Sequence, residues 1–283
     1  MPESDESRSY RDAPTSTVAV ARALLAYREL GPRGGTPLVV LTHLGANLDS
    51  WDPRVVDGLA EDRHVIALEY RGVGGSQGKV RDTIGAMAAD TIATVRALGH
   101  LRVDLFGQSM GGMVAQAVVA QAPDLVDRLI LASSGPAGGQ GLSRMTRVMV
   151  GSTLRAVATG TDPKAILFFT RSPGGREAAR AYLSRLKERV AGRDAPVTAG
   201  VFRAQLAAVH RWAAQEPADL SAFSRPVLIV HGDSDRLVPV ANASELVRRI
   251  PTATVRVFPD SGHAVVSQHH GEFLSAVRSF LQR

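Results

Sequence analysis

A serine within a glycine-rich pentapeptide is the first candidate for chemistry in this sequence. The stretch Gly107-Gln108-Ser109-Met110-Gly111 follows a short apolar run and precedes a stretch of helical character. A serine on a tight strand-to-helix turn stands clear of the backbone, and the next amide lies at a helix start, where it has no partner within the helix. The alternative is a glycine-rich turn with an incidental serine. The flanking pattern favours a nucleophile at Ser109, with the Met110 N–H as part of an anion site.

A serine nucleophile needs a base that takes its proton and a third group that orients the base. Histidine is the usual base because it titrates near neutral pH. Sites in parallel sheets form at the carboxyl ends of the strands, which leaves His43, His231 and His263 as candidates among the eight histidines. His263 follows the last predicted strand in the loop Pro259-Asp260-Ser261-Gly262-His263. We favour it as the base and interpret His231 as structural.

The loop after the preceding predicted strand offers two acids that can orient this histidine. The segment His231-Gly232-Asp233-Ser234-Asp235 contains both of them. Asp233 comes straight off the strand in a Gly-Asp turn, where an aspartate commonly caps the backbone. Asp235 lies two residues further out, where it can reach a histidine from the following loop. We favour Asp235 as the acid and keep Asp233 as the alternative.

Strands and helices alternate along most of the chain around these residues. Short apolar runs predict strands at 38–42, 64–68, 102–107, 129–132, 227–230 and 254–258, after one or two edge strands between Val18 and Leu30. Helical spacing of apolar residues predicts helices at 52–59, 83–98, 110–122, 241–250 and from about 267 onward. Short apolar strands that alternate with helices form parallel sheets covered on both faces. The sequence therefore predicts an α/β fold with a mostly parallel, doubly wound sheet of about eight strands.

This alternation stops between residues 138 and 220. No strand pattern appears there, whereas apolar residues recur at helical spacing. We therefore predict an all-helical cap over residues 138–220, inserted between two parts of an α/β core at 17–137 and 221–283. Residues 1–16 are polar and contain two prolines, which is typical of a disordered tail.

Composition excludes several classes of site and partner. The chain has 283 residues, no cysteine and a formal charge of +6, which rules out disulfides, thiolate metal sites and a cysteine nucleophile. The segment 141–215 carries 13 Lys or Arg against 4 Asp or Glu, which we interpret as a solvated helical face. No nucleic-acid-binding module, cofactor motif or metal-ligand cluster is present. The start does not resemble a signal peptide, and no apolar run approaches the roughly 18–20 residues that span a bilayer, so a soluble cytoplasmic protein without a membrane partner is expected.

The three motifs resemble the α/β-hydrolase fold superfamily in its serine-nucleophile branch. The pentapeptide around Ser109, Asp235 within Gly-Asp-x-Asp-x-x-x-Pro and His263 within Ser-Gly-His occur in that family's order of nucleophile, acid and base. The likeness covers residues 18–283, including a helical cap after the sixth strand. It implies that Ser109, Asp235 and His263 form a catalytic triad.

The resemblance also implies a second oxyanion donor just after the third strand, where this sequence departs from the family pattern. The family usually has His-Gly there, whereas this chain reads Thr42-His43-Leu44-Gly45. Alignment on Asn47 and Trp51 places His43 on the family's glycine and gives the donor amide to Leu44. Histidine cannot adopt every backbone conformation that is open to glycine, which leaves the loop conformation open. His43 either supports the loop or points into the site as a substrate-binding residue.

The resemblance implies hydrolysis of a carboxylic ester or lactone through an acyl-enzyme. The elbow serine argues against epoxide hydrolases and haloalkane dehalogenases, which carry aspartate there. A cofactor-free haloperoxidase (perhydrolase) is one alternative, and a non-catalytic ligand-binding protein of the same fold is another. Four further residues are assigned to the pocket of a small, lipophilic substrate: Gln108, Met145, Phe168 and Phe169. For the three cap residues among them, Met145, Phe168 and Phe169, burial of the cap on the core is the competing explanation.

Overall fold

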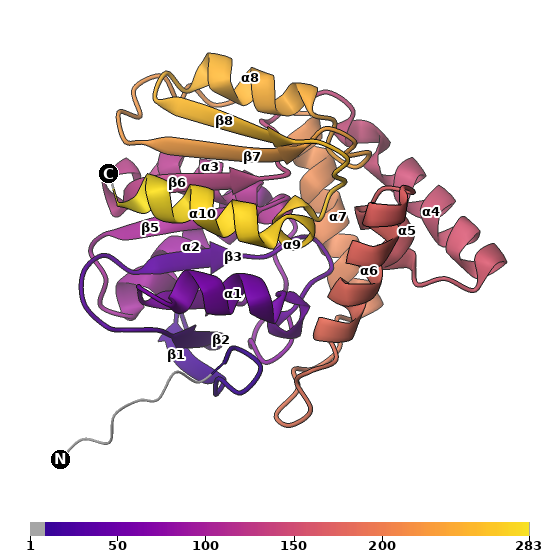
Figure 1. Ribbon diagram of the computed structural model, residues 1–283. Helices are drawn as coiled ribbons and strands as arrows, with labels where there is room; N and C mark the ends of the chain where they lie inside the picture. Colours follow the sequence, from indigo (N-terminus) through magenta and orange to yellow (C-terminus); the bar gives the residue numbers. More distant parts are fainter. Residues whose placement is uncertain (1–8, 283) are drawn as a thin grey trace.

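Eight strands form one sheet in the computed structural model, which describes residues 9–282 (Figure 1). The strand order is β1-β2-β4-β3-β5-β6-β7-β8, with β1, β2 and β4 paired antiparallel and the pairs from β4 onward parallel. The strands are β1 (Ser16–Val20), β2 (Ala23–Leu30), β3 (Leu38–Leu41), β4 (Val65–Leu68), β5 (Val103–Gln108), β6 (Val126–Ala132), β7 (Val227–Gly232) and β8 (Ala253–Phe258). The predicted mostly parallel sheet of about eight strands is confirmed.

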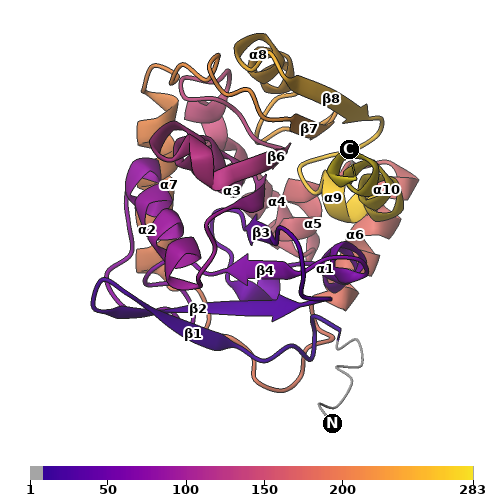
Figure 2. The ribbon, with the colours of Figure 1, turned by 90° about the vertical axis from the view of Figure 1, so that its left-hand side faces the viewer.

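Helices cover both faces of this sheet, as Figure 2 shows. One hydrophobic cluster joins alternate strand residues, such as Val39 and Leu41, to α2, α3 and α8. A second cluster joins the opposite set, such as Leu38 and Val40, to α1 and α10. These helices and the short α9 are α1 (Pro53–Ala60), α2 (Ile84–Ala97), α3 (Met110–Gln121), α8 (Ala241–Arg249), α9 (Val265–Gln268) and α10 (His270–Leu281). No helix within residues 9–282 is long and apolar enough to cross a membrane.

Four helices between β6 and β7 stand at one side of the sheet, on the right in Figure 1. They are α4 (Met145–Thr159), α5 (Pro163–Phe168), α6 (Pro173–Arg185) and α7 (Ala199–Ala213), and we refer to residues 138–220 as the cap. A buried ion pair attaches it to the core, because the Arg185 guanidinium donates to the two Asp52 oxygens at 2.8 and 2.6 Å. A 3.0 Å hydrogen bond from Ala264 N–H to the Phe168 carbonyl also ties α5 to the loop before α9.

The start of the chain differs from the predicted disordered tail of residues 1–16. Residues 1–8 lie outside the described part of the chain. Tyr10, however, is only 2 % exposed, and its hydroxyl donates to the Leu48 carbonyl at 2.8 Å. The Ser9 hydroxyl donates to Asp57 at 2.7 Å. The prediction is therefore wrong from residue 9 onward, because one buried aromatic side chain anchors a segment of otherwise polar composition.

Candidate active site

Ser109 lies at a strained turn between β5 and α3. Its backbone has φ 56° and ψ −118°, and a positive φ is uncommon for residues other than glycine. Two hydrogen bonds to the end of β6 and its loop hold the turn: Ser109 N–H donates to the Ala132 carbonyl at 2.8 Å, and Ser134 Oγ donates to the Ser109 carbonyl at 2.9 Å. Gln108, just before the turn, is buried at the end of β5. The neighbouring strand thus fixes the position of the serine at the carboxyl edge of the sheet.

Two glycines let α3 begin close to the sheet. A methyl group at Gly112 would lie 2.6 Å from the Ser134 side chain, and one at Gly111 would lie 2.7 Å from the carbonyl carbon of Leu41. The start of α3 consequently lies directly beside the end of β3 and the loop that follows it. The close packing of α3 on the sheet depends on these two positions.

Gly111→Ala is expected to destabilise the fold by about 1–3 kcal/mol and to lower activity, because the new methyl group must displace backbone next to the serine turn. Gly151→Ala in α4 is the matched control. A methyl group there meets nothing within 4 Å, so alanine should stabilise the helix by about 0.5–1 kcal/mol. Denaturant unfolding of the two variants measures both effects. A Gly111→Ala protein as stable as the wild type would contradict this account.

The side chains of Ser109, His263 and Asp235 form one hydrogen-bonded chain. Ser109 Oγ lies 2.8 Å from His263 Nε2, and His263 Nδ1 lies 2.7 Å from Asp235 Oδ2. Because an ionised carboxylate only accepts hydrogen bonds, a neutral His263 carries its proton on Nδ1 and presents the Nε2 lone pair to the serine hydroxyl. No group of three His, Asp or Glu side chains within residues 9–282 is arranged to hold a metal ion. The arrangement is suited to removing the proton of Ser109.

Asp235 is held in its ionised form. Burial alone would raise the pKa of the Asp235 carboxyl, but the neighbouring His263 lowers this pKa below its usual value. The second oxygen, Oδ1, accepts from the N–H groups of Leu237 and Val238 at 2.9 and 3.0 Å. These contacts leave Oδ2 free to hold the imidazole of His263.

Asp233 in this loop and His231 near the end of β7 have structural partners. Asp233 accepts from two backbone N–H groups of the following loop, each at 3.2 Å. His231 is fully buried, and its Nε2 donates to the Val238 carbonyl at 2.8 Å. Burial also lowers the pKa of His231. Asp233, the alternative acid, therefore lies outside the hydrogen-bonded chain that includes Asp235.

The two amides predicted as oxyanion donors lie on neighbouring segments. Met110 is the first residue of α3, where the helix offers its N–H no acceptor, and Leu44 N–H has no hydrogen-bond acceptor within residues 9–282. The parallel pairing of β3 with β5 brings the loop after β3 alongside the Ser109 turn. Within this loop Gly45, not His43, has the left-handed φ, at 73°. Histidine in place of the family's glycine is thus compatible with the loop.

Two buried side chains hold the peptide unit between Leu44 and Gly45. His43 Nδ1 donates to the Leu44 carbonyl at 2.9 Å, and Gln205 Oε1 from α7 accepts from Gly45 N–H at 2.7 Å. Burial lowers the pKa of His43 to about 4, so its imidazole is neutral at pH 7. Gln205 was not among the predicted site residues. Its signal in the sequence is a polar residue on the buried, mainly apolar face of its helix.

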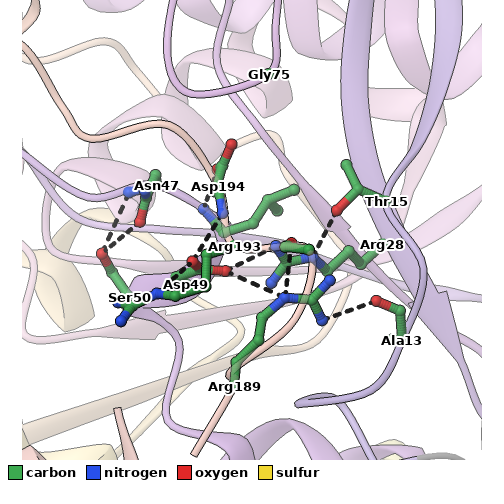
Figure 3. Close-up of polar contacts among 12 residues, drawn as sticks. Ala13, Thr15, Arg28, Asn47, Asp49, Ser50, Gly75, Arg189, Arg193 and Asp194 are labelled. Carbon is green, nitrogen blue, oxygen red and sulfur yellow. Dashed lines mark hydrogen bonds and ion pairs between the residues drawn. The ribbon is translucent and has the colours of Figure 1, made fainter. Parts of the chain in front are cut away.

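A charged cluster fixes the next part of this loop (Figure 3). At its centre, Asp49 accepts from Arg28 Nη2 at 2.7 Å and from Asp194 N–H at 2.8 Å. Arg189 and Arg193 add ion pairs to Asp49 at 3.6 Å each. Three of these residues belong to the cap. The loop after β3 is therefore held by the cap as well as by the sheet.

Two carboxyl groups meet at one backbone amide beside this cluster. Leu48 N–H lies 3.2 Å from Glu69 Oε1 and 3.2 Å from Asp194 Oδ2. Burial, with a contribution from Asp194, raises the pKa of Glu69 from 4.5 to about 9. Glu69 is consequently protonated at neutral pH and can donate a hydrogen bond to Asp194.

The proton on Glu69 should make stability depend on pH. Between pH 4.5 and about 9 the folded carboxyl keeps a proton that the unfolded chain releases, so its contribution to the free energy of unfolding falls as pH rises, by at most about 1.4 kcal/mol per pH unit. Glu69→Gln mimics the protonated acid and cannot ionise. Its melting temperature relative to the wild type should therefore increase steadily with pH in thermal unfolding across this range. A difference that stays constant with pH would contradict the protonated state.

The cap residues predicted to line a pocket divide between two environments. The Phe168 ring lies against both His43 and His263, with ring centroids 5.3 and 5.7 Å apart. Phe169 instead packs on the Tyr182 ring within the cap, with ring centroids 5.5 Å apart, and Met145 is buried in the hydrophobic cluster that joins the cap to the core. The structure thus brings Phe168 to the hydrogen-bonded chain of Ser109, while the other two bury the cap on the core.

Comparison with known proteins agrees with this fold. The sequence profile of the alpha/beta hydrolase fold matches residues 36–269. The chain belongs to the alpha/beta hydrolase fold family. The family expected from the three motifs is therefore confirmed.

Solved alpha/beta hydrolases superpose on the chain over almost its whole length. An alpha/beta hydrolase fold protein from Chitinophaga pinensis is 30 % identical, with a TM-score of 0.91 over 97 % of this chain and 99 % of that chain. The N-acyl homoserine lactone degrading enzyme Est816 is 26 % identical, with a TM-score of 0.73 over 94 % of this chain and 100 % of that chain. The pimeloyl-[acyl-carrier protein] methyl ester esterase of Aliivibrio salmonicida is 28 % identical over 88 % of this chain and 93 % of its own length. These relatives support an enzyme of the hydrolase class.

Proposed function

We propose that this alpha/beta hydrolase cleaves a carboxylic ester or lactone of a small, lipophilic substrate through an acyl-enzyme on Ser109. The proposal rests on the 2.8 Å contact between Ser109 Oγ and His263 Nε2, continued by the 2.7 Å contact from His263 Nδ1 to Asp235. A serine hydroxyl is a weak nucleophile unless a base accepts its proton and an acid orients that base. The esterase and lactone-degrading relatives support this substrate class.

In the first step, Ser109 Oγ attacks the carbonyl carbon while its proton passes to His263 Nε2. Asp235 stabilises the resulting imidazolium through Nδ1–H. The carbonyl oxygen becomes an oxyanion, for which the Leu44 and Met110 amides are the donors. Collapse of this intermediate breaks the bond to the alkoxy oxygen, which leaves as an alcohol with the proton from His263.

In the second step, water replaces the alcohol. His263 takes a proton from the water, whose oxygen attacks the acyl carbon and forms a second tetrahedral intermediate. Its collapse breaks the bond to Ser109 Oγ, which regains its proton from His263, and the carboxylic acid is released. With a lactone, the alkoxide of the first step stays joined to the acyl chain, so the product is a hydroxy acid.

Burial of the site supports the lipophilic character of the substrate. Ser109 and His263 are each 3 % exposed, and the Phe168 ring from the cap lies against His263. A substrate that reaches Ser109 must leave water, which is unfavourable for charged groups and favourable for apolar ones. We therefore expect esters of apolar acyl chains to be preferred over charged ones of the same length.

Intact-mass spectrometry after treatment with a fluorophosphonate probe tests the nucleophile. We expect one probe per chain on the peptide that contains Ser109, and hydrolysis of at least one class within a panel of esters and lactones. Labelling at another residue, or no labelling, would overturn the mechanism.

Two further measurements distinguish the proposed ester hydrolase from the two alternatives, a perhydrolase and a non-catalytic binding protein. Bromide oxidation in acetate and peroxide, compared with ester hydrolysis, distinguishes a perhydrolase from an esterase. If the wild type and Ser109→Ala are equally inert on the panel and bind a ligand alike, the protein is a non-catalytic binding protein of this fold.

A further inference from the structure

Two buried nitrogen atoms at the loop after β3 lack a hydrogen-bond partner within the described part of the chain. They are His43 Nε2 and Gln205 Nε2, on side chains of residues that are 7 % and 0 % exposed. The other polar atom of each side chain is engaged, His43 Nδ1 with the Leu44 carbonyl and Gln205 Oε1 with Gly45 N–H. Unpaired buried polar atoms are destabilising. The two side chains that carry these atoms bind the two ends of one peptide unit, and we take this as an indication of a place for a ligand.

The two nitrogen atoms have complementary hydrogen-bonding chemistry. Because Nδ1–H of neutral His43 donates to Leu44, its Nε2 carries a lone pair and can only accept. The low pKa of about 4 keeps the imidazole in this form at neutral pH. Gly45 N–H is a donor, which fixes the oxygen of the Gln205 amide toward it and leaves the NH₂ as a donor. One acceptor and one donor therefore flank the same loop.

The loop that these side chains hold lies beside groups that the proposed function uses. The Phe168 ring contacts the rings of His43 and His263, with centroids 5.3 and 5.7 Å apart. The peptide unit that His43 and Gln205 hold adjoins the Leu44 amide, which receives the oxyanion in the proposed mechanism. The two side chains therefore flank the peptide unit next to the proposed oxyanion donor.

We propose that His43 Nε2 and Gln205 Nε2 form a subsite for a substrate group that both donates and accepts a hydrogen bond, as a secondary amide or a hydroxyl does. The proposal rests on the proposed function and names its substrate class more closely. The substrates are esters or lactones with an amide or hydroxyl near the scissile carbonyl. His43 accepts from that group, and Gln205 donates to it.

Matched substrate pairs test the subsite. Methyl N-acetylglycinate is compared with methyl N-acetylsarcosinate, which lacks the N–H, and methyl glycolate is compared with methyl methoxyacetate, which lacks the O–H. The wild type should favour the donor-bearing member of at least one pair by about 10–100-fold in kcat/KM. The pair that responds identifies the group as an amide or a hydroxyl.

The variant His43→Asn removes the hydrogen-bond acceptor Nε2 while it keeps a donor for the Leu44 carbonyl, which supports the loop. The asparagine NH₂ lies as many bonds from the backbone as Nδ1, so it can still donate to Leu44, whereas Nε2 is gone. The preference within the responding pair should fall toward one, and this ratio cancels effects common to both members. Gln205→Glu keeps an oxygen for Gly45 and removes the donor, so both members should lose kcat/KM relative to methyl propionate. Thermal unfolding verifies that the variants fold.

The outcomes distinguish this subsite from the proposed function. If the wild type is labelled at Ser109 and hydrolyses methyl propionate but shows no preference in either pair, the subsite is wrong and the serine hydrolase stands. The subsite is also wrong if His43→Asn keeps the full preference. Absence of both labelling and hydrolysis would overturn both proposals. If a variant fails to fold, the wild-type ratios still decide between these results.

Discussion

Replacing Ser109 by alanine is expected to lower kcat by about 10⁴–10⁶-fold, because it removes the hydroxyl oxygen that lies 2.8 Å from His263 Nε2 and that this nitrogen is placed to deprotonate. The fold should persist, since the hydrogen bonds of the turn use the Ser109 backbone, with Ala132 and Ser134 as partners. Alanine meets the same backbone strain as serine at this positive φ. The activity that remains would come from the oxyanion donors and substrate binding alone.

Ser109→Cys gives a second measurement of the same position. The sequence contains no cysteine, so this variant has a single thiol, placed next to His263. A neighbouring imidazole favours the thiolate, and we expect one equivalent of iodoacetamide to react faster than with a free thiol. Steady-state hydrolysis and circular dichroism of both variants complete the comparison. Activity of Ser109→Ala within about tenfold of the wild type would exclude Ser109 as the nucleophile.

Asp235→Asn is expected to lower kcat by about 10³–10⁴-fold while the site remains assembled. The N–H groups of Leu237 and Val238 hold one oxygen of residue 235, so the new amide must turn its NH₂ toward His263. That NH₂ favours the imidazole tautomer with the proton on Nε2. In this tautomer His263 cannot accept the proton of Ser109.

The neighbouring acid provides the matched control for this substitution. Asp233→Asn changes the same atoms two residues away, where the side chain only accepts from backbone N–H groups of the following loop. We expect its kcat to stay within about tenfold of the wild type, with any loss appearing in thermal stability. Equal losses of kcat in the two variants would remove Asp235 from the mechanism.

The sheet and the serine turn were predictable because each depends on residues close in sequence. Short apolar strands bounded by helices admit few arrangements other than a covered parallel sheet. His263 followed from that sheet, since its loop leaves the last strand at the edge where Ser109 lies. Asp235 required one more choice, between two acids that differ by two positions.

The residues that escaped prediction act across long stretches of chain. Gln205 contacts Gly45 from 160 residues away, and a single polar residue on a buried helix face does not say which amide it meets. Tyr10 lies in a segment whose average composition is polar, although one buried ring is enough to anchor it. The backbone of the loop around His43 also depended on a torsion angle, at Gly45, that the residue types alone left open.

The long-range supports of the loop after β3 set an order of assembly. The Gly45 N–H can donate to Gln205, and the Leu48 N–H to Asp194, only after those later residues have been synthesised. Asp194 lies 146 residues after Leu48. During synthesis, strands β1 to β6 and the serine turn emerge before any of these partners, and His263 emerges later still. Asp235 and His263 are added only with the C-terminal strands, so the hydrogen-bonded chain that starts at Ser109 cannot form until nearly the whole sequence has been synthesised.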